Sequence, residues 1–154
     1  MKTNASPTRP DLDPGYITGF IEASGVFTYC RSGPQLTVVF SLRSTADNSR
    51  LLDSIRRFLG GVGRIYGGRE PAAGGPRPCQ LRVTRPAELL RLVEHLEAHP
   101  LRGQRRAVFA IWREMVYSRA ANHGRRAPGE LEALAAELTR CLARRRPRER
   151  TLRA

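Results

Sequence analysis

The stretch ITGFIEASG, residues 17–25, decides the fold of this chain. Asp13 precedes it as an N-cap candidate, and Pro14 occupies the first helical position, where a missing N–H costs nothing. Gly25 is a typical residue for ending a helix. The sequence therefore predicts a helix from Pro14 to about Ser24.

Two small residues lie one turn apart on this helix. Gly19 and Ala23 share one face, although a glycine inside a helix costs about 1 kcal/mol relative to alanine. Small side chains there allow another part of a protein to approach the helix closely. Two packings would use this face: a second helix lies against it, or the chain's own sheet does.

The residues that follow the helix predict a β-hairpin. Residues 26–31 form its first strand, and the Ser-Gly-Pro sequence at residues 32–34 forms the turn. Residues 35–43 then alternate between apolar and mostly polar side chains, which is the period of a half-buried strand.

The rest of the chain repeats this order and then continues as helices. Asp47 is a second N-cap candidate, before a helix with apolar residues at helical spacing that Gly60-Gly61 ends. Two more strands and three more helices are predicted, at about residues 62–66, 79–84, 86–98, 103–119 and 130–142. Four antiparallel strands with helices on one face form an α+β layer.

The predicted sheet face that points away from the helices is polar, bears arginine and lacks acids. A face exposed only to solvent normally mixes both signs of charge, and that remains the alternative. Arg, Gln, Ser and Thr, however, are the side chains that read base edges in the major groove. The candidate DNA-binding residues are Thr28, Cys30, Thr37, Ser41, Arg43, Arg64, Tyr66, Gln80, Arg82 and Thr84.

The composition also favours a polyanionic partner. The 154 residues suit one domain, and 27 basic against 14 acidic residues give a net charge of +13. All basic residues except Lys2 are arginine, whose planar fork suits phosphate and guanine, although a GC-rich genome would favour the same codons. No apolar run is long enough to span a membrane and no secretory signal is present, so a cytoplasmic, nucleoid-associated location is expected.

Three stretches together resemble the LAGLIDADG homing endonuclease family. Residues 17–25 are similar to its motif, and residues 40–63 to its second strand, second helix and glycine-rich turn. Residues 96–112 are similar to its Pro-Leu turn and the basic helix after it. The resemblance covers roughly residues 13–119 and implies an αββαββα fold with a four-stranded antiparallel sheet.

Domain boundaries follow from that coverage. Residues 1–12 are expected to be disordered, and residues 13–120 to form the LAGLIDADG-type DNA-binding domain. Residues 121–154 are expected to form a linker, an amphipathic C-terminal helix and an Arg-rich tail.

The resemblance also implies a partner arrangement. In the family two such helices pack together, either from two copies in one chain or from two subunits, and this chain has one copy. A homodimer on pseudo-palindromic double-stranded DNA is therefore implied. Its interface would contain Tyr16, Gly19, Phe20 and Ala23.

The family's catalytic positions are altered. The family uses Mg²⁺ to hydrolyse phosphodiester bonds, and Ser24 stands at the position of its metal-binding acid, where a hydroxyl is a poor Mg²⁺ ligand. Glu22 matches the motif's other acid, but it lies about 200° around the helix and would bind metal only if the helix end shifted. Ser44 stands where the family often has glutamine near the reacting phosphate. Arg105 matches the family's basic residue after the Pro-Leu turn, so the resemblance implies a cation beside the phosphate.

These departures leave several functions open. The leading hypothesis is a homing-endonuclease-type protein of intron or mobile-element origin that binds DNA site-specifically, with Mg²⁺ as its cofactor only if hydrolysis survives. The alternatives are a non-cleaving DNA-binding regulator, an RNA-binding protein similar to the maturases, and a structural module with no nucleic-acid role.

Overall fold

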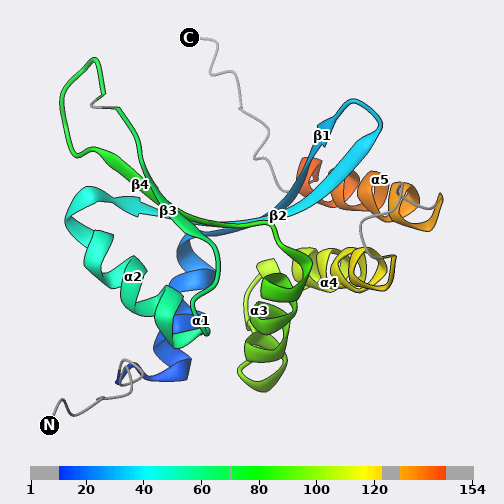
Figure 1. Ribbon diagram of the computed structural model, residues 1–154, viewed down its shortest axis with the longest axis horizontal. Helices are drawn as coiled ribbons and strands as arrows, with labels where there is room; N and C mark the ends of the chain where they lie inside the picture. Colours follow the sequence, from blue (N-terminus) through cyan, green and yellow to red (C-terminus); the bar gives the residue numbers. More distant parts are fainter. Residues whose placement is uncertain (1–10, 70, 123–128, 145–154) are drawn as a thin grey trace, which may run out of the picture.

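The computed structural model describes residues 11–69, 71–122 and 129–144, and the order of its elements is αββαββα followed by two helices (Figure 1). The elements are α1 (Pro14–Ser24), β1 (Gly25–Ser32), β2 (Gln35–Thr45), a short 3-10 helix η1 (Ala46–Asn48), α2 (Ser49–Phe58), β3 (Arg64–Gly67), β4 (Pro78–Val83), α3 (Pro86–Ala98), α4 (Arg105–Ala121) and α5 (Gly129–Ala143). The expected α+β fold class is confirmed. In these residue ranges, no helix is both long and apolar enough to cross a membrane.

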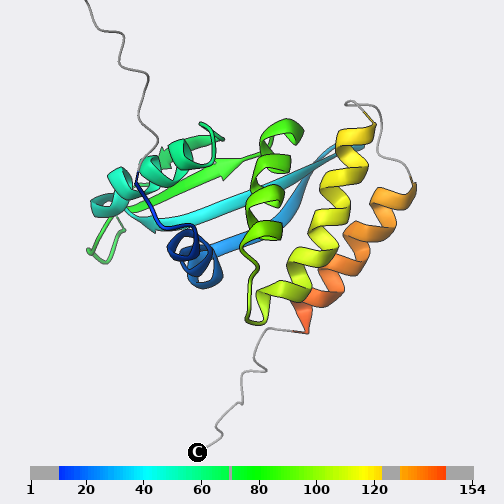
Figure 2. The same ribbon diagram turned by 90° about the horizontal axis from the view of Figure 1, so that it is seen from below.

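The strands form one antiparallel sheet in the order β1-β2-β4-β3. The helices gather on one side of this sheet, as two views at right angles show (Figure 1, Figure 2). The opposite face of the sheet therefore has no helix over it within the described chain.

Helix α1 forms for the local reasons that the sequence indicates. The Asp13 carboxylate accepts a hydrogen bond from the Tyr16 N–H at 3.1 Å, which satisfies a donor at the helix start. Ile17 and Ile21 point into the core and are fully buried. At the other end only glycine fits, because a Cβ on Gly25 would lie 2.6 Å from the Ile21 carbonyl oxygen. The expected helix and its N-cap are confirmed.

The core beneath the β1–β2 hairpin is aromatic. The ring centroid of Trp112, on α4, lies 5.0 Å from that of Phe27 on β1 and 6.3 Å from that of Phe40 on β2. The indole N–H of Trp112 also reaches two strand carbonyl oxygens, those of Thr28 at 3.2 Å and Val39 at 3.0 Å. Helix α4 is thereby tied to both strands of the hairpin.

Three element boundaries differ from the prediction. Asp47 lies within η1, and α2 begins at Ser49 without a hydrogen bond from a capping side chain. The third strand begins later than residue 62 because Gly63 adopts a φ of 66° and donates its N–H to the Glu88 carboxylate at 3.0 Å. That conformation takes the backbone out of the extended region. Thr84 lies just past the end of β4.

The expected disorder of residues 1–12 is wrong at its end, because Leu12 packs half-buried against the hydrophobic core. Residues 1–10, most of the expected linker (123–128) and most of the Arg-rich tail (145–154) lie outside the described residues. The expected C-terminal helix is confirmed as α5.

Candidate nucleic-acid interface

Cross-strand pairing arranges the polar sheet face in rows. Ser41 of β2 pairs with Arg82 of β4, and Arg82 pairs in turn with Arg64 of β3. The adjacent row holds one residue from each of the same strands: Arg43, Gln80 and Tyr66. Nearer the hairpin turn, Thr28 pairs with Val39 and Cys30 pairs with Thr37. The register thus brings together the residues predicted to bind DNA, except Thr84, which lies just past the end of β4.

Exposure differs along this face. Arg43, Arg64, Cys30 and Tyr66 are exposed, whereas Thr28, Thr37, Gln80, Arg82 and Thr84 are half-buried. Arg82 crosses over β2, since its Nη2 lies 3.8 Å from the Cys30 Sγ on β1. Ser41 is only 5% exposed because it lies on a central strand, paired on both sides. Its hydroxyl is therefore less accessible than the sequence suggested.

The charge on this face is entirely positive at the positions that the structure describes. Arg43, Arg64 and Arg82 lie there, and no acidic residue does. Acids instead form ion pairs on the helix side of the molecule. Examples are Glu132 with Arg31, Asp53 with Arg56 and Arg57, and Glu97 with Arg113. The resulting separation of charge leaves a positive face that suits a polyanion.

The outer face of α1 is open. Tyr16 is 49% exposed, Ala23 is exposed, and a Cβ added at Gly19 would meet nothing within 4 Å. Phe20 is half-buried, with its ring centroid 6.4 Å from that of Tyr16. The small residues therefore do not pack against this chain's own sheet, which excludes that alternative. The four residues predicted for the dimer interface share one helix face, on which Tyr16, Gly19 and Ala23 are exposed and Phe20 packs half-buried against the core.

The C-terminal end of α1 is capped by Arg105 from α4. Its guanidinium donates to the backbone carbonyl oxygens of Glu22 at 2.5 Å, Ala23 at 3.3 Å and Gly25. Those carbonyls include groups that a helix end leaves without partners, and a cation is favoured there by the helix dipole. Arg105 was expected to serve a phosphate; in this structure its donors face the helix end.

Glu22 also contacts the segment that leads into α4. Its carboxylate accepts the backbone N–H groups of Arg102 at 2.9 Å and Gly103 at 3.0 Å, in the turn before α4. Ser44, which was expected near a reacting phosphate, accepts a hydrogen bond from the Asn48 side chain at 2.9 Å. Glu22 and Arg105 therefore join α1 to α4, while Ser44 belongs to a separate contact at the end of β2.

The sequence of this chain matches a known protein family. The sequence model of the LAGLIDADG endonuclease family matches residues 17–116. The chain belongs to this family. A 50.9 kDa uncharacterized protein in intron 1 of ND4 of Podospora anserina is 32% identical over 114 residues, which are 68% of this chain and 24% of that protein. The LAGLIDADG chain described here thus spans about a quarter of that relative's length.

Solved LAGLIDADG structures share the fold. I-AabMI bound to uncleaved DNA is 27% identical, with a TM-score of 0.69 over 82% of this chain and 44% of its own. The archaeal intron-encoded homing endonuclease I-Vdi141I, complexed with DNA, is 29% identical, with a TM-score of 0.66 over 83% of this chain and 82% of its own. I-TnaI is 22% identical, with a TM-score of 0.66 over 87% of this chain and 98% of its own.

The residues at the end of α1 do not fit the divalent metal that the LAGLIDADG family implies. Ser24 offers a neutral hydroxyl, and both carboxylate oxygens of Glu22 already accept backbone N–H groups. The neighbouring carbonyls face the Arg105 guanidinium, whose charge repels a cation. A hard divalent cation prefers anionic oxygen ligands that are free to coordinate it.

Sequence reasoning missed the structural role of this LAGLIDADG helix end. Nothing local to Arg105 indicates that its partners are carbonyl oxygens about 80 residues earlier in the chain. The only available signal combines two features. Arg105 lies at the start of α4, and the neighbouring α1 ends without a local basic residue.

Proposed function

We propose that this chain binds double-stranded DNA site-specifically as a homodimer and has lost the metal-dependent hydrolysis of its family. The observation that carries the proposal is the polar sheet face, which bears arginines and no acid at its described positions. Side chains of these types recognise base edges and phosphates. The DNA in the solved complexes of I-AabMI and I-Vdi141I supports the same partner.

The open face of α1 supports the dimer. Helix α1 leads directly into β1, so pairing two copies through Gly19 and Ala23 sets their two sheets side by side. Small residues allow the two helix backbones to approach closely. A two-fold protein of this kind matches a pseudo-palindromic site with two half-sites.

The end of α1 supports the proposed loss of hydrolysis. In a homodimer the substitution at Ser24 occurs twice, so the same two helix ends both lack the anionic ligand. Arg105 already supplies a positive charge there. Binding is therefore proposed to need no divalent cation.

Replacing Arg43 with alanine tests the use of the sheet face. Arg43 is exposed in the row with Gln80 and Tyr66, so we expect Arg43→Ala to weaken binding to the preferred duplex by about 1–3 kcal/mol and to relax the preference at the base pairs it contacts. Fluorescence anisotropy on preferred and scrambled duplexes measures both effects. Arg140→Ala, which removes the same charge from an exposed position on α5, is the matched control.

Equal losses for Arg43→Ala on all duplexes would remove this residue from base recognition. Competition with RNA at matched salt separates the DNA-binding proposal from a maturase-like function. Stronger binding to RNA than to the preferred DNA would favour the latter.

Restoring an acid at Ser24 tests the loss of hydrolysis. We expect the native protein to bind its preferred duplex equally in Mg²⁺ and in EDTA and to leave it intact. Ser24→Asp puts an anionic oxygen at each of two apposed helix ends, and we expect it to produce nicking that depends on Mn²⁺ or Mg²⁺. Ser44→Asp adds the same charge elsewhere and should not cut. Metal-dependent cleavage by the native protein would contradict the proposal.

A further inference from the structure

The outer part of the β1–β2 hairpin is a two-stranded ribbon. Residues 35–39 of β2 pair with β1 alone, whereas Phe40 to Leu42 pair with both β1 and β4, and Arg43 to Thr45 pair with β4 alone. Two-stranded ribbons are marginally stable by themselves in water. This ribbon therefore depends on whatever packs against its helix-side face.

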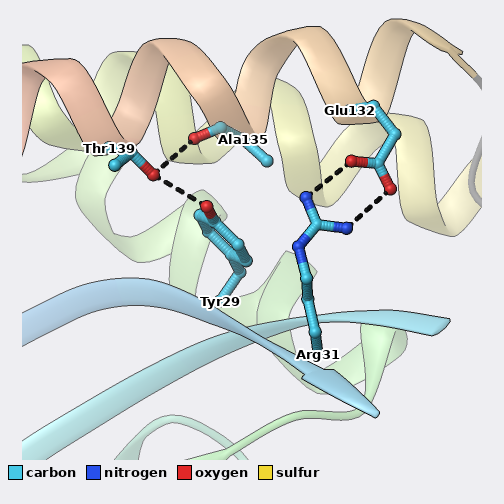
Figure 3. Close-up of polar contacts among 5 residues, drawn as sticks. All are labelled: Tyr29, Arg31, Glu132, Ala135 and Thr139. Atoms are coloured by element: carbon cyan, nitrogen blue, oxygen red, sulfur yellow. Dashed lines mark hydrogen bonds and ion pairs between the residues drawn. The ribbon is translucent and has the colours of Figure 1, made fainter. Parts of the chain in front are cut away.

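Helix α5 contacts that face near the ribbon's tip (Figure 3). The Arg31 guanidinium donates to both carboxylate oxygens of Glu132, at 2.9 and 2.6 Å. The Tyr29 hydroxyl lies 2.7 Å from the Thr139 Oγ1, which itself donates to the Ala135 carbonyl at 3.0 Å. Because a threonine hydroxyl has one proton, Tyr29 is the donor to Thr139.

Helix α5 is itself anchored. Leu131, Ala135 and Leu138 are fully buried, and α5 runs beside α4 (Figure 2). Trp112 of α4 already holds the base of the ribbon through the carbonyls of Thr28 and Val39. The ribbon thus has two supports, with α4 at its base and α5 toward its tip.

The supported residues alternate with those that face away from the helices. Tyr29 and Arg31 point to α5, so Thr28 and Cys30 point to the polar face, opposite Val39 and Thr37. Strand β1 starts at the end of α1 and runs away from it, so these residues lie far from a two-fold axis at α1. Helix α5 therefore supports the ribbon on the face opposite to Thr28 and Cys30.

We propose that Glu132 and Thr139 are positioning residues for DNA selectivity at the outer end of each half-site, acting through Arg31 and Tyr29. This inference rests on the proposed DNA-binding function and adds an element outside the family match at residues 17–116. The Arg31–Glu132 pair is close to half exposed, at 46% and 40%, so it contributes little to global stability. The hydrogen bonds from Arg31 hold the pKa of the Glu132 carboxyl below its usual value, so the pair is ionised at neutral pH.

The test compares the native dimer with the double variant Glu132→Gln/Thr139→Val. Hydrogen exchange without DNA should show the amides of residues 28–38 exchanging about fivefold faster in the variant, while residues 40–45 keep their protection. Sites selected from a random duplex library should lose base preference at the outermost positions only. Glu137→Gln, the same charge change at an exposed position of α5, should leave both measurements unchanged.

Rescue separates positioning from a general effect of charge. The swapped pair Arg31→Glu/Glu132→Arg restores an ion pair in the same place and should return outer preference and slow exchange, whereas Arg31→Glu alone should not. Unchanged exchange and unchanged outer preference in the double variant would overturn the inference, as would a preference lost equally at every position. A native protein that selects no duplex would refute the proposed function, and the exchange comparison would still decide whether α5 holds the ribbon.

Discussion

Gly19→Val is expected to convert the proposed dimer to a monomer. The added Cβ meets nothing within 4 Å in the single chain, and valine costs less than glycine inside a helix, so the protomer should keep its stability. Two helices that meet at this position, in contrast, have no space for the branched side chain. Sedimentation equilibrium measures the change in mass.

The same variant should bind DNA much more weakly. Separating the two half-site contacts removes the gain from simultaneous binding, which is about 10²–10⁴-fold. Ala110→Val, at an exposed position of α4, is the matched control and should remain dimeric. A Gly19→Val protein that sediments as a dimer with undiminished affinity would exclude α1 as the interface.

Trp112→Ala is expected to lower the free energy of unfolding by about 3–5 kcal/mol. The side chain is fully buried against Phe27 and Phe40, so truncation leaves a cavity beneath the hairpin. Such a loss is a large share of the about 5–15 kcal/mol that stabilises a typical domain. Urea denaturation followed by circular dichroism measures it.

Trp112→Phe distinguishes packing from hydrogen bonding at this site. Phenylalanine keeps an aromatic ring but cannot donate to the carbonyls of Thr28 and Val39, so we expect a smaller loss of about 1–2 kcal/mol. If the two variants were equally destabilised, the hydrogen bonds rather than the packing would dominate.

Much of the fold could be predicted because its signals are local. The start of α1 is set by Asp13 and Pro14, and its end is set by Gly25. Each acts within about one turn of backbone, and the predicted bounds match. The alternation in residues 35–43 assigned β2 to its two faces because side chains alternate in any strand. Where a local signal competed with the geometry of the chain, as at Asp47 and Gly63, the prediction of the boundary was wrong.

The candidate site could be predicted only in part. The composition of the polar face and the shared helix face of Gly19 and Ala23 follow from periodicity, and the register then brought Arg43, Gln80 and Tyr66 into one row. The burial of Ser41 could not be predicted, because it depends on two neighbouring strands. The DNA-binding and dimer roles of these residues stay predictions until they are measured.

The sequence by itself determined the order of elements and the side chains on each face, and it predicted that Ser24 stands in place of the family's acid. The tertiary structure decided that Glu22 binds the amides of Arg102 and Gly103 and that Arg105 caps α1. The physical reason is the range of the interactions. Helix caps and strand alternation act over a few residues, whereas these hydrogen bonds join groups about 80 residues apart, which meet only once the sheet and helices have packed.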